Sequence, residues 1–405
     1  MKLQLLKFLP LLVIALVVGS CDGPPTDEEL FSSLKKDVYF LAADELGGRA
    51  IGTTGEQKAA EYLAQEFEKL GLTPMGTNGF FQEFTVSKPS NPHEEAVIGT
   101  DGAGVTGRNV VAFLDKKADK TIVIGAHFDH LGMGGQGSLH RGDSAIHNGA
   151  DDNASGTAAL LALAKIFKYE TLKSNILFVA FSGEENGLWG SNYFVKNSTL
   201  DLKLVNFMIN MDMVGRMNDS SKTITVGGYG TSPSWKTMIE SVKKKEFTIR
   251  VDSSGTGPSD HTSFYRKDIP VLFFFTGLHS DYHKPSDDAD KINYVGMLKI
   301  IRFIQQMIES KQLQRVKTVY RGYAQTRYLP LVKSDLQELK ASETEVIDRV
   351  IEQMSDWSAA AISQYSHKDM PWIASKEGEI INYELAFYRE APFSVRNYGE
   401  EHEEQ

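Results

Sequence analysis

The feature that most constrains the fold is a regular alternation of short apolar runs with helical segments along the middle of the chain. Runs such as "TIVIGAHFD" (121–129), "NILFVAFSG" (175–183) and "PVLFFFTG" (270–277) have the apolar character of strands that are buried on both faces. Segments such as "NASGTAALLALAKIFK" (153–168) and "NYVGMLKIIRFIQQMIESK" (293–311) have helical spacing. This alternation predicts an α/β fold, with a mainly parallel mixed sheet sandwiched by helices.

The N-terminus predicts a targeting segment. Lys2 and Lys7 accompany the apolar run "FLPLLVIALVVGS" (8–20), which is too short to span a membrane comfortably. The small residues before Cys21 in "VGSC" resemble a bacterial lipoprotein cleavage site. We therefore expect residues 1–20 to be removed and Cys21 to carry a lipid, so that the protein is exported and anchored to a bacterial membrane on its periplasmic or cell-surface face. The alternative is an ordinary signal peptide with an incidental cysteine. Cys21 is the only cysteine, which excludes an intrachain disulfide.

The remaining chain is predicted to contain a catalytic domain over residues 21–312 and an extension over 313–405. The extension is expected to be mostly helical because "SETEVIDRVIEQMSDWSAAAI" (342–362) is amphipathic and starts with capping-box spacing. Its role is not readable from the sequence. Lys and Arg number 43 against 53 Asp and Glu, and no basic patch interleaved with aromatic residues occurs. Nucleic acid is therefore not an expected partner.

Residues able to bind a metal ion follow most of the predicted strands. They are His127 and Asp129, Glu184 and Glu185, Asp212, and His283 with Asp287. A further pair, Asp151 and Asp152, lies in "NGADDNASG" (148–156) at a turn into a helix, with no Lys or Arg within five residues. Open α/β sheets gather such residues at the carboxyl ends of their strands, so these side chains are expected to meet.

Imidazole and carboxylate together suit zinc, and two histidines with three carboxylates exceed the needs of one tetrahedral ion. A bridging carboxylate would let the set hold two ions, and we expect Asp151 in that place, with Asp152 directed elsewhere. Asp129 is expected to accept the second ring N–H of His127, and Asp287 that of His283.

Adjacent side chains diverge, so one residue of the Glu184–Glu185 pair can bind metal while the other serves as a general base. Taken singly, each of these residues is also typical of a packing or solvated position. The other histidines, His130 among them, have no comparable support.

Six separated motifs resemble, in order, the signature of secreted bacterial di-zinc aminopeptidases, a family related to glutamate carboxypeptidase and glutaminyl cyclase. They are "GAHFDHLG", "NGADDNASGTAALL", "FSGEENGLWGS", "INMDMVGR", "GPSDHTSF" and "DYHKPSDDADKI". The similarity extends over about residues 27–312 and includes "GGRAIGTTGEQKAAEYLAQEF" near the N-terminus.

The resemblance implies roles for the residues that match these motifs. His127 and Asp212 would hold one zinc ion, Glu185 and His283 the other, and Asp151 would bridge them through a peptide to Asp152 that the family often holds cis. Glu184 would be the general base, and Asp129 would support the first histidine.

The implied function is hydrolysis of the N-terminal peptide bond of peptides that have a free N-terminus, with two Zn²⁺ per chain. Three alternatives stay open. One is a single-zinc enzyme resembling glutaminyl cyclase, and another is a carboxypeptidase for acidic C-termini, for which the only nearby cations are Arg141, Arg216 and Arg266. The third is a surface lipoprotein that binds peptides without catalysis.

Overall fold

The computed structural model describes residues 23–87, 97–99, 104–242 and 247–310, together with the backbone of 313–320 and 323–330. The chain divides into two units, residues 1–332 and 333–405. The predicted signal peptide, Cys21 and the helix expected over 342–362 lie outside the described residues. The predicted domain boundary after residue 312 stays a prediction.

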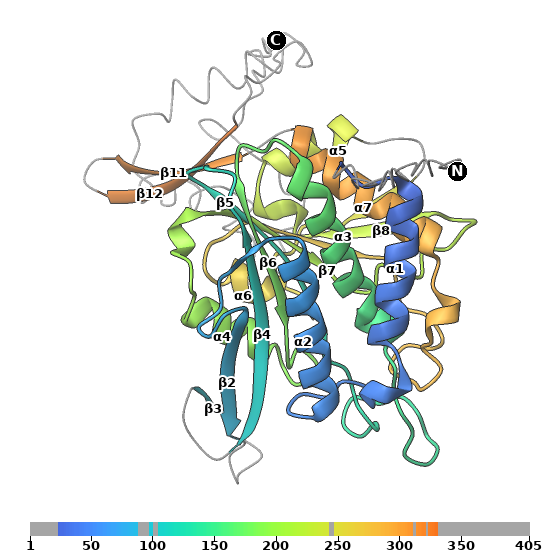
Figure 1. The fold of residues 1–405 in the computed structure, drawn as a ribbon. Helices are drawn as coiled ribbons and strands as arrows, with labels where there is room; N and C mark the ends of the chain where they lie inside the picture. The colour runs from blue at the N-terminus through green and yellow to red at the C-terminus, as the bar shows by residue number, and fades with distance from the viewer. Residues whose placement is uncertain are drawn as a thin grey trace, which may run out of the picture. The chain divides into compact units, whose positions relative to one another are not determined.

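Within the described residues, ten strands form one mixed sheet in the order β3-β2-β4-β6-β5-β7-β10-β8-β9, with β1 paired to β4 (Figure 1). The strands are β1 (Thr73–Pro74), β2 (Phe81–Ser87), β3 (Val97–Gly99), β4 (Val105–Leu114), β5 (Thr121–His127), β6 (Asn175–Phe181), β7 (Val205–Met211), β8 (Thr223–Gly227), β9 (Thr248–Val251) and β10 (Val271–Phe275). The four central strands, β6, β5, β7 and β10, are parallel to one another. Antiparallel pairs join β4 to β6 and β8 to β10 on either side of them.

Helices cover both faces of the sheet. They are α1 (Asp27–Leu41), α2 (Thr54–Lys69), α3 (Gly156–Tyr169), α4 (Trp189–Lys196), α5 (Ser234–Val242), α6 (His261–Tyr265) and α7 (Tyr294–Ser310), with short turns η1 (Asp44–Leu46), η2 (Ala150–Ser155), η3 (Leu202–Leu204), η4 (Tyr229–Thr231) and η5 (Ala289–Lys291). Side chains of α1, α2, α3, α5 and α7 share one apolar core, and those of α4 and α6 share a second. None of the helices in the described part of the chain is both long and apolar enough to cross a membrane.

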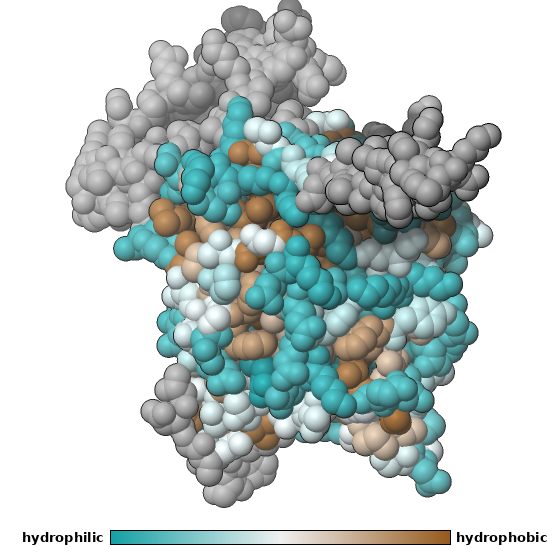
Figure 2. All heavy atoms as spheres, in the orientation of Figure 1, coloured by the Kyte–Doolittle hydropathy of each residue, from teal (hydrophilic) through white to brown (hydrophobic). Residues whose placement is uncertain are grey.

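The two cores arise from the two-residue period of the strands. In β4, Val110 and Ala112 belong to the first core whereas Val111 belongs to the second. All seven residues of β5 are buried, as are those of β6 and β7. The helical face in Figure 2 is mostly hydrophilic, with apolar residues in separate small areas, so the apolar stripes of these helices face the sheet.

The predicted fold class is confirmed, with the parallel strands in the centre of a mixed sheet. The short strands β1 and β9 were not predicted. In the expected helical extension, the described backbone forms an antiparallel strand pair, β11 (Leu313–Tyr320) and β12 (Tyr323–Pro330), which was not predicted either.

Candidate metal centre

The carboxyl ends of adjacent parallel strands bring the predicted residues together. His127 is the last residue of β5, the Glu184–Glu185 pair follows β6, and Asp212 follows β7. Asp152 lies in η2, which leads into α3. Because β6, β5 and β7 are neighbours in the sheet, these four segments end at one edge.

The first group of possible ligands comprises His127, Glu184 and Asp212, whose ligand atoms all lie within 4.8 Å of one another. His127 Nε2 is 3.4 Å from Asp212 Oδ1, and both atoms are buried without a hydrogen-bond partner within the described residues. Burial raises the pKa of Glu184 well above its usual range and also raises that of Asp212. Burial opposes protonation of His127, but Asp212 and Glu184 raise its pKa.

The second group comprises His130, Asp152 and Glu185, and His283 lies against it. His130 Nδ1 is 2.6 Å from Glu185 Oε1, and His283 Nε2 is 3.2 Å from Glu185 Oε2. Burial opposes ionisation of Asp152 and Glu185, but the surrounding histidines lower the pKa of both carboxyl groups.

Asp152 connects the two groups. Its Oδ1 is 3.4 Å from His127 Nε2, and its Oδ2 is 3.0 Å from His283 Nε2. One carboxylate therefore presents one oxygen to each group, which is the geometry that a bridging ligand requires.

The bridging position predicted for Asp151 is corrected by this geometry. Asp151 is fully buried outside both groups, and its Oδ1 accepts hydrogen bonds from the Gly215 N–H at 2.7 Å and the Ser155 hydroxyl at 3.0 Å. Its Oδ2 lies 3.2 Å from His279 Nε2. Asp151 thus links the loops after β7 and β10 to η2, while its neighbour Asp152 faces the histidines. The cis peptide also lies one residue later than expected, between Asp152 and Asn153.

The role predicted for Asp287 is also wrong. Its carboxylate accepts hydrogen bonds from the backbone N–H groups of Asp151 and Asp152, at 2.9 and 3.0 Å, and so orients the bridging segment instead of His283. The ring of His283 is oriented by the carbonyl of Gly137, which is 2.7 Å from Nδ1. That bond fixes Nδ1 as the protonated nitrogen and leaves Nε2 facing the carboxylates.

Asp129 lies beside His127 as predicted, but both its backbone carbonyl and its side-chain carboxylate lie near the His127 ring. The backbone carbonyl of Asp129 is 3.2 Å from His127 Nδ1, and the carboxylate Oδ1 is 3.7 Å away. The shorter contact is the hydrogen bond. The same carboxylate oxygen accepts the backbone N–H of Glu184 at 3.1 Å, so Asp129 joins the loops after β5 and β6.

Sequence reasoning missed His130. It is buried, and its Nε2 has no hydrogen-bond partner within the described residues. The available signal was its place in "HFDH", three residues after His127, but the sequence alone does not show that its ring turns inward to Glu185.

A pocket of about 90 Å³ opens beside both groups. Its apolar wall consists of Met213, Pro258, Phe273, Phe275, Leu278 and Tyr282. Among the described residues that line this pocket, the histidine of the centre is the one basic side chain, and no lysine or arginine is present to recognise a carboxylate.

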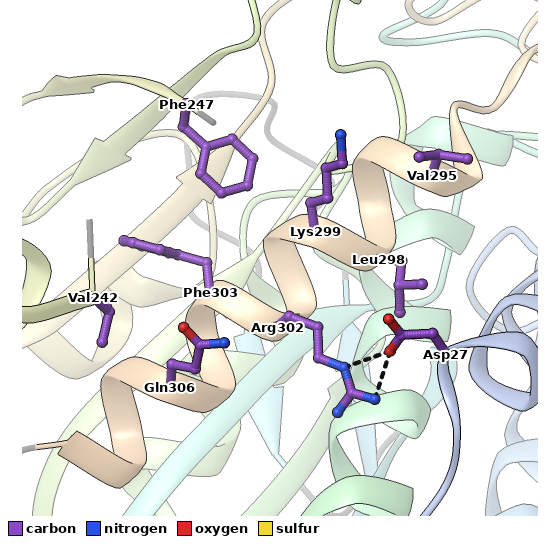
Figure 3. A pocket seen from close by; sticks show the side chains of 9 residues that line it. All are labelled: Asp27, Val242, Phe247, Val295, Leu298, Lys299, Arg302, Phe303 and Gln306. Atoms are coloured by element: carbon purple, nitrogen blue, oxygen red, sulfur yellow. Dashed lines mark hydrogen bonds and ion pairs between the residues drawn. The ribbon is translucent and has the colours of Figure 1, made fainter. Parts of the chain in front are cut away.

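A larger cavity, of about 440 Å³, lies along α7 (Figure 3). Its charged side chains are Asp27, Lys299 and Arg302, and Arg302 is directed at Asp27 with contacts of 2.9 and 2.7 Å. The described residues that line this cavity include no histidine, and neither ligand group lies there, so it is not the candidate centre.

The residues at the strand ends fit divalent metal ions. Two groups of imidazoles and carboxylates lie side by side, and one carboxylate reaches both. In the first group, the buried atoms His127 Nε2 and Asp212 Oδ1 lie 3.4 Å apart with no hydrogen-bond partner among the described residues. Buried polar atoms of this kind are costly unless something cationic pairs with them. Nitrogen and oxygen ligands of this kind are typical of zinc.

Comparison with known families places most of the sheet in one of them. The model for peptidase family M28 matches residues 109–308. A second model, for an antitoxin SocA-like, Panacea domain, matches residues 289–373 and overlaps the first over residues 289–308.

Among curated proteins, YfbL from Escherichia coli strain K12, described as uncharacterised, is 26% identical over 303 residues, which cover 66% of this chain and 84% of that protein. Aminopeptidase YwaD from Bacillus subtilis strain 168 is 30% identical over 154 residues, covering 36% of this chain and only 34% of that protein. The chain therefore spans most of the first relative but about a third of the second.

Two solved structures share the fold. The zinc aminopeptidase BSAP from Bacillus subtilis has a TM-score of 0.53 at 17% identity, covering 71% of this chain and 95% of that one. Glutaminyl cyclase from Bacteroides thetaiotaomicron, bound to N-acetylhistamine, has a TM-score of 0.56 at 19% identity, covering 71% and 99%.

Proposed function

Because this chain belongs to peptidase family M28, we propose that it is a metallo-exopeptidase that removes N-terminal residues from peptides with two zinc ions. His127 and Asp212 would hold one ion and Glu185 and His283 the other. The observation that carries the proposal is the Asp152 carboxylate, with one oxygen 3.4 Å from His127 Nε2 and the other 3.0 Å from His283 Nε2.

Glu184 is assigned as the general base. Its carboxyl lies half-buried in the first group, and its raised pKa suits a group that both accepts and returns a proton. The zinc ions, when bound, would polarise the scissile carbonyl and lower the pKa of an attacking water. Glu184 accepts the proton of that water at a carboxylate oxygen and then donates it to the departing amine.

The pocket supports an apolar N-terminal side chain. Phe273, Phe275 and Leu278 form an apolar surface next to Glu184 and Asp212. A substrate residue there excludes water from the carboxylates, which strengthens the electrostatic interactions of the centre. The α-amino group of the same residue would lie near the ligand carboxylates, which favours cleavage at a free N-terminus.

The first test is the number of metal ions per chain in protein purified without chelator, measured by elemental analysis. The second is hydrolysis of a peptide with an N-terminal leucine, with its N-acetylated form as the matched control. We expect two zinc ions and cleavage of the free peptide alone. Equal cleavage of both peptides would overturn the exopeptidase assignment.

The alternative of a glutaminyl cyclase with one zinc ion is supported by the likeness to the cyclase structure. It predicts one ion per chain and ammonia release from a peptide with an N-terminal glutamine. The two adjacent ligand groups favour the peptidase instead. A chain that binds peptides but converts neither of them would instead support the third alternative, a binding lipoprotein.

Export and lipid attachment at Cys21 are proposed from the sequence alone. The small residues before Cys21 follow a basic and apolar leader. We expect the protein to fractionate with membranes and the Cys21→Ser variant not to do so. Mass spectrometry of the N-terminal peptide would show the lipid, and an unmodified Cys21 would contradict this proposal.

A further inference from the structure

Arg49 is a fully buried cation whose hydrogen bonds all go to backbone carbonyl groups. Nε donates to the carbonyl of Phe128 at 2.7 Å, and Nη1 and Nη2 donate to those of Asn148 and Gly149 at 2.7 and 3.0 Å. Nη1 also donates to the carbonyl of Leu41, at the end of α1. Within the described residues, no carboxylate accepts a hydrogen bond from Arg49, although a buried charge normally has such a partner.

The carbonyls that Arg49 contacts belong to the two loops that carry ligands. Phe128 lies directly after His127, and Asn148 and Gly149 lie shortly before Asp152. These segments are about twenty residues apart in the chain, so one guanidinium joins them. The planar guanidinium has five N–H donors in a rigid fork, which lets it serve carbonyls on both sides at once, whereas a lysine ammonium has three donors on one atom.

The backbone around Arg49 fits tightly between the same loops. The Gly48 carbonyl accepts the N–H of Gly132 at 3.0 Å, and the Arg49 carbonyl accepts that of His130 at 3.3 Å. A Cβ on Gly48 would lie 2.5 Å from the Gly132 carbonyl oxygen and 2.6 Å from that of His147. Arg49 itself has a φ of +52°, which is uncommon for a side chain with a Cβ and indicates a position fixed by its surroundings.

We infer that Arg49 is a positioning residue of the centre, which holds the loops after β5 and before α3 so that His127 and Asp152 face each other. This inference rests on the proposed two-metal function and names a residue on which that function depends. Arg49 contacts neither the ligand side chains nor the pocket, so its effect is exerted through the backbone.

The charges around Arg49 agree with this role. Burial lowers the pKa of Arg49 to about 10, and Asp129, Asp152, Asp287 and Glu185 oppose that shift. The guanidinium therefore stays protonated at neutral pH, and the carboxylates of the centre are its counter-charges. A fixed cation behind a cluster of carboxylates also reduces their mutual repulsion.

The test compares Arg49→Lys with Arg302→Lys. Lysine keeps the charge but not the fork of donors. Arg302, on α7 (Figure 3), is the matched control because it also donates to a backbone carbonyl, that of Pro25. The first readout is amide hydrogen exchange of metal-free full-length protein over residues 126–132 and 147–156. We expect exchange there to be at least tenfold faster in Arg49→Lys and unchanged in Arg302→Lys.

The second readout is zinc affinity, measured by competition with a chelating dye. We expect Arg49→Lys to bind zinc at least tenfold more weakly while Arg302→Lys binds normally. Normal zinc affinity and normal exchange in Arg49→Lys would overturn the inference, as would an equal loss in the control.

Two further outcomes are informative. If the parent protein binds no zinc, the proposed function fails, and the exchange experiment alone decides whether Arg49 orders the loops. If Arg49→Lys does not fold, amide hydrogen exchange of the unsubstituted protein provides the test. Exchange in both loops that is nearly as slow as in the central strands supports the inference, and rapid exchange in both loops contradicts it.

Discussion

The two ligand groups of the centre differ in how the protein itself balances their charge. In the first group, two carboxyl groups, those of Glu184 and Asp212, surround one imidazole, and the pKa of each carboxyl is raised. In the second group, Glu185 lies 2.6 Å from His130 and 3.2 Å from His283, and Asp152 lies 3.0 Å from His283. The pKa of each carboxyl in this group is lowered.

This difference supports the separate roles proposed for two neighbouring residues of one turn. A carboxyl group that the protein leaves poorly compensated retains its proton readily, which suits a base that must later return it. A carboxylate surrounded by imidazoles is ionised and oriented, which suits a metal ligand. Glu184 and Glu185 are therefore expected to differ in function although they are adjacent.

The largest expected effect on activity comes from substituting each of these two residues on its own. Glu184→Gln should lower kcat by roughly 10²–10⁴-fold, the usual contribution of a general base, and leave two zinc ions bound. Glu185→Gln should instead lose one ion, because it removes a ligand. Elemental analysis and steady-state kinetics on both variants check this, and full activity in Glu184→Gln would remove Glu184 from the mechanism.

A smaller effect separates Asp152 from Asp151. Asp152→Asn should weaken zinc binding by at least about 100-fold, because it removes the one carboxylate that reaches both groups. Asp151→Asn should keep the zinc but lower the free energy of unfolding by about 1–3 kcal/mol, because one of the two acceptor oxygens becomes an NH₂ group, so that either His279 or Gly215 and Ser155 lose their acceptor. Zinc titration and urea unfolding distinguish these outcomes, and the reverse result would restore Asp151 as the bridging residue.

The pH dependence of zinc binding tests one histidine of each group. Partial burial opposes protonation of His283, but its contacts with Asp152 and Glu185 raise its pKa to about 10, and the pKa of His127 is also raised. At neutral pH both rings hold protons that an ion must displace, so zinc affinity should rise with pH, about tenfold per unit for each proton released. Calorimetry in buffers with different heats of ionisation counts these protons, and an affinity independent of pH would contradict the assignment of both histidines.

The sheet and the approximate place of the centre could be predicted because both follow from local patterns. Buried strands are continuous apolar runs, and His127, Glu184 and Asp212 each come directly after such a run. The parallel order of β6, β5 and β7 then brings these residues to one edge without any further information.

The choice between Asp151 and Asp152 could not be predicted, because it depends on which of two adjacent side chains finds hydrogen-bond donors. The three donors to Asp151 come from the turn itself, from Gly215 and from His279, and the last two are distant in sequence. For the same reason Asp287 was assigned to the wrong partner. Arg49 had no signal beyond its motif, because its contacts with loops at 128 and 148 exist only in the folded protein.

The smallest expected effect concerns Glu56, which is connected to the first group through Ser182, two residues before Glu184. Its carboxylate accepts the hydroxyl of Ser182 at 2.9 Å, just before Glu184, and burial raises its pKa from 4.5 to about 7 despite the contact with Arg108. A carboxyl with a raised pKa binds its proton more tightly in the folded state, so stability is complete below pH 4.5 and falls as the pH rises towards 7.

Glu56→Gln should therefore match the parent in stability near pH 4.5 and exceed it above pH 7, by on the order of 1–3 kcal/mol. Urea unfolding across this pH range measures the difference, with Glu61→Gln on the exposed face of α2 as the control that should stay flat. A destabilised Glu56→Gln at pH 8 would mean that the ionised carboxylate is needed by Arg108. The first group would then depend on a buried ion pair behind it, and its charge would be better compensated than the comparison with the second group implies.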